Sequence, residues 1–155
     1  MSVRNCAEVG KILQETISRL MANDRLCRLL YFTDRDPFGS LAEKFGLIKE
    51  NMTEKEKEAA EKEALSMWGQ IKSKEIYEKL IKIIPRVGAK EYDNSLLVVR
   101  VARGSKNMGN NEFLDLAIYI ESFVPLTQWA IDDENLRPFL ILGEIQKSLD
   151  GKRMN

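Results

Sequence analysis

Two acidic clusters are the first residues in this chain whose types and spacing could do chemistry. Asp34 and Asp36 stand two positions apart, and Asp132, Asp133 and Glu134 are consecutive. Paired carboxylates can act as general acid and base, or they can bind a cation. Both clusters, however, lie where turns and helix starts favour Asp without any further function. We therefore interpret them as structural, and we expect Asp132 or Asp133 to cap the last helix.

Other familiar catalytic arrangements are missing from the sequence. The chain contains no His, which is the commonest general base and the commonest metal ligand. Ser and Thr nucleophiles therefore have no His to activate them. Gly104 and Gly109 have the spacing of a phosphate-binding P-loop, but the Lys-Ser/Thr pair of that motif is absent. The sequence thus predicts a non-enzymatic protein with no catalytic, cofactor-binding or metal-binding residues, and it needs no cofactor.

The two cysteines also favour a structural role. Cys6 and Cys27 lie on helical patterns without CxxC spacing, and no signal peptide precedes them. A reactive thiol would need a cationic or helix-terminal setting that lowers its pKa. We interpret both residues as reduced core thiols of a protein made in the cytosol.

Charge is balanced in total and uneven along the chain. Lys plus Arg and Asp plus Glu both number 24, so no basic excess favours binding to nucleic acid. Six basic residues and two acidic ones lie between Lys72 and Lys90, whereas the segment from Glu112 to Glu134 carries six acids and no base. The pattern predicts a dipolar molecule suited to head-to-tail association. The alternative is that these charges only keep the protein soluble.

Length and hydropathy indicate one domain. The chain has 155 residues, of which 44% are hydrophobic and 31% charged, as in an ordinary globular domain. No apolar run approaches the roughly 20 residues that a membrane-spanning helix needs. We expect a single domain over residues 1–155 with no membrane partner.

Helical periodicity marks both ends of the chain. The pattern predicts a helix over residues 5–21, a second short helix begun by Asn23 or Asp24, and a last helix with Pro138 in its first turn and Gly151 after its end. Apolar residues at helical spacing should form the buried faces of the first and last helices: Val9, Ile12, Leu13, Ile17, Leu20 and Met21, then Leu136, Leu140, Ile141, Ile145 and Leu149.

A polar helix is expected in the middle of the chain. Thr53 followed by Glu56 matches a capping box, and the next residues are strong helix formers. We predict a solvated helix near residues 53–68, anchored to the body by Trp68. A coiled coil would need a sustained apolar heptad that is absent here.

The periodicity then changes to that of strands. Residues 80–87 contain a proline and suit an edge strand, residues 95–103 read as a buried strand, and residues 113–122 alternate. The last two should pair as a hairpin, with Leu114, Leu116, Ile118 and Ile120 facing the core. We therefore predict an α+β fold: a mostly antiparallel sheet of three to four strands, packed by N-terminal and C-terminal helices, with the polar helix as an addition.

Three segments together resemble a known family. They are NDRLCRLLYFTDRDPF at 23–38, IPRV at 84–87 and NLRPFLILGEI at 135–145, with the long hairpin between the last two. This combination resembles the neck proteins of tailed bacteriophages, and most of all the tail terminator or tail-completion proteins that join head to tail. The polar helix near 54–63 looks like an elaboration of that pattern.

The resemblance implies a virion structural protein at the head–tail junction, assembled in the host cytoplasm. Such a subunit forms a ring, commonly a hexamer, that caps the tail tube and joins it to the head connector. Its partners would be other copies of itself and the tail-tube and connector proteins, while DNA passes through the ring without sequence-specific binding. Two alternatives stay open: a small cytosolic adaptor or regulatory domain, and, less favoured, an enzyme of unusual mechanism.

Two sets of residues are candidates for assembly contacts. Asp115 and Glu121 could face the ring lumen and repel DNA, or they could meet the basic segment of a neighbouring subunit, for which Lys82 and Arg86 are candidates. The hairpin loop over 104–111 could be ordered by a neighbour, and its candidate contact residues are Ser105, Lys106, Asn107, Met108 and Asn110.

Overall fold

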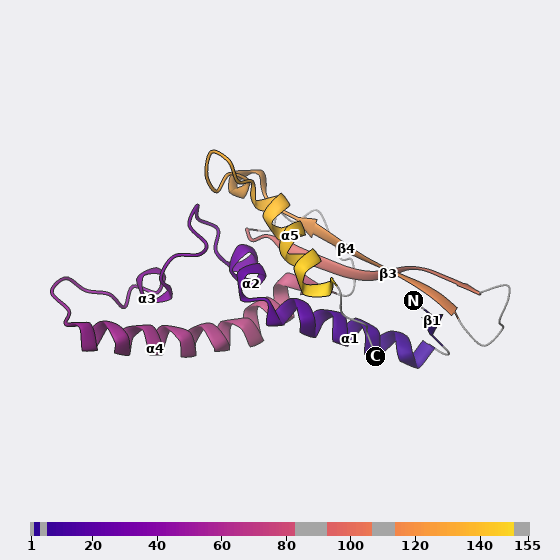
Figure 1. Cartoon of the computed structure of the whole chain (residues 1–155), viewed down its shortest axis with the longest axis horizontal. Helices are drawn as coiled ribbons and strands as arrows, with labels where there is room; N and C mark the ends of the chain where they lie inside the picture. Colours follow the sequence, from indigo (N-terminus) through magenta and orange to yellow (C-terminus); the bar gives the residue numbers. More distant parts are fainter. Residues whose placement is uncertain (1, 4–5, 83–92, 107–113, 151–155) are drawn as a thin grey trace.

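A computed structural model describes the backbone of residues 2–3, 6–82, 93–106 and 114–150, and the side chains within 8–81, 93–101 and 117–150. The described chain is elongated. A central body of helices and sheet carries one long helix that extends from one end and a β-hairpin that extends from the other (Figure 1).

The two N-terminal helices form as the sequence predicts. Helix α1 spans Cys6–Ala22, and helix α2 spans Asp24–Tyr31. Asn23 caps α2, because its side-chain oxygen accepts a hydrogen bond from the Leu26 backbone N–H at 3.1 Å. The predicted apolar stripe of α1 is confirmed, with Ile12, Ile17 and Leu20 buried.

The polar helix is confirmed and is longer than predicted. Helix α4 spans Glu54–Ile71, and the capping box between Thr53 and Glu56 is present. A short helix α3, Leu41–Lys44, was not predicted and packs beside α4. We call residues 41–67 the arm, because this part of the chain extends away from the body (Figure 1). Trp68 anchors the arm as expected: it is buried and stacks on Phe32 with ring centroids 5.4 Å apart.

The chain stays helical beyond α4, over residues for which no element is predicted from the sequence. A π-helix η1, Lys72–Leu80, follows directly and buries Ile76 and Leu80. The predicted edge strand over 80–87 is confirmed at Ile81 and Lys82, and it begins one residue later than predicted because Leu80 completes the helical face. Strand β2 is described only over Ile81–Lys82, and residues 83–92 lie outside the described chain.

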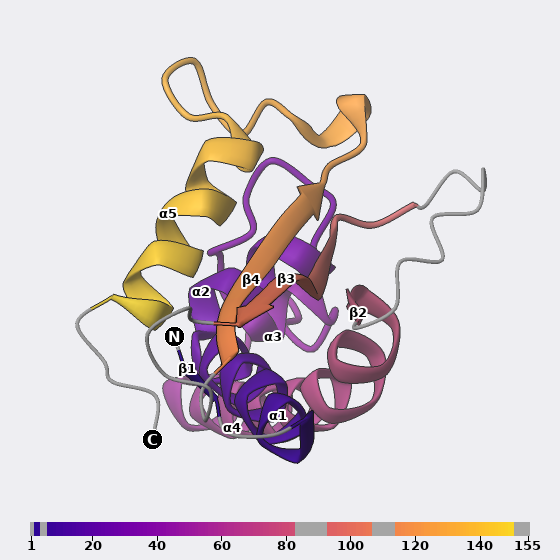
Figure 2. The same ribbon diagram turned by 90° about the vertical axis from the view of Figure 1, so that its right-hand side faces the viewer.

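The sheet has two long central strands and an edge strand on each side, of which two residues each are described. Strand β1 is Ser2–Val3, β3 is Leu96–Lys106 and β4 is Leu114–Phe123, in the order β1-β4-β3-β2. Strands β3 and β4 pair antiparallel, as predicted, whereas β2 pairs parallel to β3 at the edge. Helices cover one face of this sheet (Figure 2), so the α+β class is confirmed.

The hairpin strands extend further than predicted on one side. Gly104, Ser105 and Lys106 continue β3 and pair with β4 opposite Leu116, Asp115 and Leu114. The register shifts between Val101 and Arg103, which is the signature of a β-bulge, and pairing resumes after it. The predicted loop over 104–111 therefore begins too early. On β4, Ile118 and Ile120 pack against the core as expected, while Tyr119 is exposed.

The last helix begins later than its predicted cap. A 3-10 helix η2, Leu126–Gln128, leads through a bridge between Ala130 and Leu136 to helix α5, Arg137–Leu149. Ile141 and Ile145 are buried as predicted, but Leu136 is exposed because it is the N-cap of α5 instead of part of its inner face. Gly151 lies outside the described chain. Among the described helices, none is long and apolar enough to cross a membrane.

Candidate functional site

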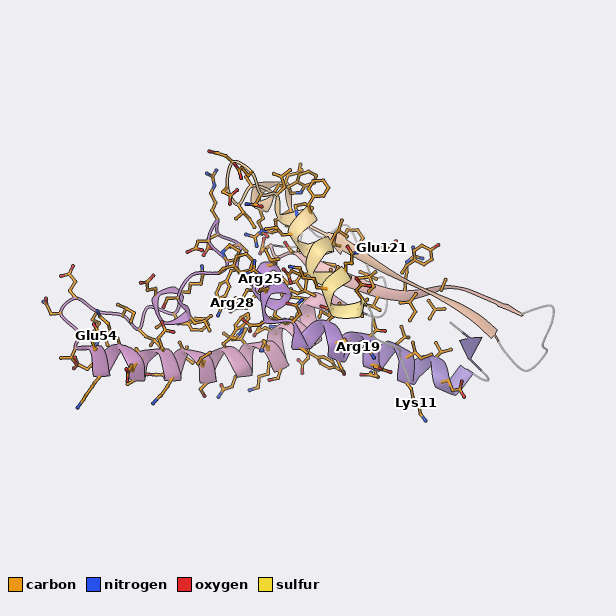
Figure 3. The ribbon with its side chains drawn as sticks, viewed as in Figure 1. Lys11, Arg19, Arg25, Arg28, Glu54 and Glu121 are labelled. Atoms are coloured by element: carbon orange, nitrogen blue, oxygen red, sulfur yellow. The ribbon has the colours of Figure 1, made fainter. Side chains whose placement is uncertain are left out.

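The structure places Glu121 in an ion pair within its own chain. Its carboxylate accepts a hydrogen bond from the Arg100 guanidinium on the neighbouring strand β3 at 2.7 Å. This bond holds the pKa of Glu121 below its usual range and raises the pKa of Arg100. Glu121 lies on β4 of the hairpin (Figure 3). A lumen or interface role for Glu121 stays a prediction, and its charge is already partly balanced by Arg100.

The other candidates of that set are placed by backbone register only. Lys82 pairs with Val98 across β2 and β3, and Val98 pairs with Glu121 across β3 and β4. Lys82 and Glu121 thus occupy one row of the same sheet, two strands apart. Asp115 occupies β4 opposite Ser105, several positions away along the strand. Arg86 lies outside the described residues.

The structure describes only part of the candidate assembly loop. Ser105 and Lys106 are strand residues, as reported above, because their backbones pair with β4. Asn107, Met108 and Asn110 lie outside the described residues. A contact role for them stays a prediction.

One Asp of each acidic cluster stabilises a turn, as the structural interpretation predicted. Asp34 accepts a hydrogen bond from the Asp36 backbone N–H at 3.0 Å, and it forms an ion pair with Lys44 at 2.9 Å. Asp132 accepts bonds from the backbone N–H groups of Glu134 and Asn135 at 2.9 and 2.7 Å. These bonds close a turn before α5, so the expectation that Asp132 or Asp133 caps that helix is wrong.

Arg137 is the functional group that sequence reasoning missed. Its side chain is fully buried, although it carries a charge. The guanidinium donates hydrogen bonds to the backbone carbonyls of Gln128 at 2.8 Å, Leu29 at 2.8 Å and Phe32 at 2.7 Å, and also to that of Asp34. Burial lowers the pKa of Arg137. The carbonyls at the C-terminal end of α2 carry partial negative charge, which favours a cation at this position.

A second polar group joins the same two helices at their other ends. The Glu144 side chain is nearly buried and accepts hydrogen bonds from Lys147 at 2.9 Å, Asn23 at 3.1 Å and Arg25 at 3.2 Å. Asn23 also donates to Ser148 at 2.9 Å. We call this contact between α2 and α5, with Arg137 at one end and Glu144 at the other, the seam. Arg25 lies on α2 near α5 (Figure 3).

The seam brings together two of the segments that carry the sequence resemblance. Residues 23–38 supply α2 and the turn after it, and residues 135–145 supply Arg137 and Glu144. No spacing rule could have paired them, because their separation in the chain exceeds 100 positions. An Arg directly before a helical Pro gives no signal of burial by itself.

A hollow beside the seam collects polar groups without forming a catalytic arrangement. Gln128 donates to the Asp93 carbonyl and accepts from the Ser95 hydroxyl at 3.2 Å. The hollow is lined by Tyr31, Phe32, Thr33, Asp34, Glu75, Asp93, Asn94, Thr127 and Gln128. Within the described residues, no group of three or more His, Cys, Asp or Glu side chains is placed to hold a metal ion.

Cys27 is a buried core thiol, as predicted. Burial raises the pKa of Cys27 to about 11, so the thiol stays protonated near neutral pH. The side chain of Cys6 lies outside the described residues.

Comparison with known proteins identifies a family. A family model described as YomW matches residues 23–155, which include both sides of the seam, the arm and the sheet strands β2 to β4 but not α1. No curated protein and no solved structure matches the chain significantly.

Proposed function

Because the chain belongs to the YomW family, which is phage-related, we propose that it is a non-enzymatic structural subunit of the virion at the head–tail junction. Copies of the chain form a ring that caps the tail tube and joins it to the head connector. DNA passes through this ring without sequence-specific contacts. The protein assembles in the host cytoplasm and works in the neck of the particle.

The observation that carries this proposal is the presence of two different projections on one body. The arm extends from one end of the described chain and the β3–β4 hairpin from the other (Figure 1). In a head-to-tail ring each copy contacts one neighbour through one surface and the next neighbour through a different surface. Two unlike projections on opposite ends supply such a pair of surfaces.

The arm offers an exposed apolar contact for this purpose. A hollow between α3 and α4 is lined by Ile48 and Leu65 among charged residues, and Leu65 is 58% exposed. Large exposed apolar side chains beside a hollow are typical of protein contact surfaces. A neighbour that covers Leu65 would remove this apolar surface from water.

The first experiment is native mass spectrometry and negative-stain imaging of the purified full chain. We expect closed rings of one stoichiometry. The Leu65→Asp variant should remain a folded monomer, because its side chain is already in water and only a neighbour would be repelled. The matched control Lys55→Ala, on the same helix but outside the lining of the hollow, should still form rings. A wild-type protein that is strictly monomeric at all concentrations would contradict the ring.

The second experiment tests the location in the particle. Phage deleted for this protein should accumulate filled heads and separate tails, and a tagged copy should be found by immunogold labelling at the neck. A protein absent from particles and dispensable for head–tail joining would instead support the cytosolic adaptor.

A further inference from the structure

A second apolar surface lies at the end of the molecule formed by η2 and the start of α5. Five large apolar side chains are exposed there: Leu126 at 81%, Phe139 at 66%, Leu142 at 48%, and Leu136 and Trp129 at 39% each. We call these five residues the η2–α5 surface. Soluble monomers rarely expose contiguous apolar patches of large side chains unless the patch binds something.

Backbone contacts hold these side chains together. The Trp129 backbone N–H donates to the Leu126 carbonyl at 3.3 Å, so both residues lie on the same single turn. The Arg137 backbone N–H donates to the Trp129 carbonyl at 2.7 Å, which places η2 directly beside the start of α5. Leu136, Phe139 and Leu142 follow one another at three-residue spacing along one side of that helix. The two rows of apolar side chains therefore adjoin.

The surface is also held rigidly. The Trp129 indole N–H donates to the Val124 carbonyl at 3.0 Å, and Asp132 closes the turn between the two rows. Arg137 fixes the start of α5 through three buried and one partly buried hydrogen bond to backbone carbonyls. Ordering a contact surface before it binds lowers the entropic cost of association. Trp, Phe and Leu held in this way are suited to the centre of a protein interface.

Charge around this surface indicates the chemistry of its partner. Asp133 and Glu134 are exposed in the turn beside it, and neither forms an ion pair within the described residues. Arg137 is buried, and Lys147 pairs with Glu144 near the other end of α5. The rim is therefore acidic, and it disfavours nucleic acid. A complementary protein surface would be apolar at its centre and basic around it.

The arm of a second copy of the chain is poorly suited to bind the η2–α5 surface. The arm hollow is apolar at Ile48 and Leu65, but its rim carries four acids and two bases, namely Glu43, Glu54, Glu58, Glu61, Lys57 and Lys62. Docking the η2–α5 surface into it would bring acidic groups against acidic groups, which disfavours that contact.

We propose that the η2–α5 surface binds a different protein, through an apolar segment flanked by Lys or Arg residues. This inference describes the chemistry of one partner of the proposed virion subunit. It rests on the proposed function only in placing that partner in the virion. Leu136 at the N-cap, Phe139 and Leu142 follow an oblique line around the start of α5, and this line suits a helical segment that crosses α5 at an angle.

Two synthetic helical peptides test this proposal. Both carry Leu along one face of the helix, and all remaining positions are Lys in one peptide and Glu in the other. Fluorescence anisotropy of the labelled peptides should show that the full chain binds the Lys peptide at least ten times more tightly than the Glu peptide. Phe139→Ser and Leu126→Ser should each weaken binding of the Lys peptide tenfold or more. Both residues are largely exposed, so we expect normal melting of both variants.

Matched controls separate this surface from the arm. Leu65→Ser should leave peptide affinity unchanged, and Phe139→Ser should leave ring formation unchanged. The double variant with Asp133→Lys and Glu134→Lys should lose the preference for the Lys peptide. If the peptides do not bind, the proposed position of the protein in the virion is unaffected. If the protein is absent from particles, the proposed peptide-binding surface is unaffected, so the two proposals can fail separately.

Four results would overturn the proposal. Binding of neither peptide would remove the docking site. Equal binding of both peptides, or binding unaffected by Phe139→Ser, would show that the acidic rim or the apolar surface does not select the partner. Loss of self-association in Phe139→Ser would assign this surface to a second copy of the chain.

Discussion

The seam and the arm are built in opposite ways. In the seam, Arg137 bonds to the Leu29 carbonyl across 108 positions of the chain, and Asn23 bonds to Glu144 across 121. In the arm, the capping-box bonds between Thr53 and Glu56 span three positions and are exposed to water. The seam therefore depends on the complete fold, whereas the start of α4 in the arm is stabilised by neighbouring residues.

This difference indicates where substitution of a polar group should lower the free energy of unfolding most. A buried polar group that loses its partner has no water to replace it, whereas an exposed group does. Substitutions in the seam should therefore act on the stability of the whole domain, and those in the arm should act locally. The predictions below test this contrast, from the largest expected effect to the smallest.

Replacing Arg137 by Met should have the largest effect. The variant leaves four backbone carbonyls without their donor, three of them at buried bonds, and each buried acceptor that loses its donor costs about 1–3 kcal/mol. Arg137→Lys keeps the charge but cannot reach all four carbonyls, so we expect a smaller loss. Urea denaturation followed by circular dichroism measures both. Equal stability of wild type and Arg137→Met would show that the seam does not hold the domain.

Replacing Glu144 by Gln should have the next largest effect and should depend on pH. Burial raises the pKa of Glu144, but hydrogen bonds from Lys147, Asn23 and Arg25 outweigh burial and hold the pKa below its usual 4.5. A lowered pKa in the folded state stabilises the fold above the unfolded-state value, and this stabilisation disappears as pH falls through the folded value. We expect a loss of about 1–2 kcal/mol at pH 7.

The pH series isolates the carboxylate. The gap in unfolding free energy between wild type and Glu144→Gln should narrow as pH falls from 7 through 4.5 toward 3. Lys147→Ala is the matched control, because it removes one exposed donor and leaves the buried carboxylate bonded to Asn23 and Arg25. If the difference in unfolding free energy between wild type and Glu144→Gln stays constant over this pH range, the loss of stability comes from packing and not from the charge of Glu144.

Replacing Trp68 by Phe tests the joint between arm and body. The substitution keeps an aromatic ring against Phe32 but removes the hydrogen bond from the indole N–H to Asp24 at 2.6 Å. We expect a loss of about 1 kcal/mol, the typical net contribution of one hydrogen bond. Hydrogen exchange should show faster opening of α4 than of α5. Uniform acceleration across both helices would mean that arm and body open as one unit.

Replacing Thr53 by Ala should have the smallest effect. It removes the capping box of α4, and loss of such a cap costs about 0.5–2 kcal/mol of local helix stability. Because α4 begins far from the seam, we expect fraying of its first turn with little change in the global urea midpoint. Amide exchange of residues 54–58 measures this fraying. A shift of the midpoint as large as that of Arg137→Met would contradict the local character of the arm.

Features that depend on neighbouring residues could be predicted from the sequence. The capping box at Thr53, the Asn23 cap, the apolar stripe of α1 and the alternation of Ile118, Tyr119 and Ile120 follow from spacings of two to four residues. The α+β class followed from these elements in order. The turn roles of Asp34 and Asp132 were also recognisable, because Asp stabilises turns through its own backbone neighbourhood.

The tertiary structure alone decided the rest. The bulge after Val101 shifted the register between β3 and β4, and Leu80 completed the buried face of η1, so that β2 begins at Ile81. Arg137 is buried because its guanidinium meets carbonyls that another part of the chain supplies, and those partners exist only after α2 and α5 pack together. Local sequence specifies the backbone of each element, but the burial of a charge depends on groups far away in the chain.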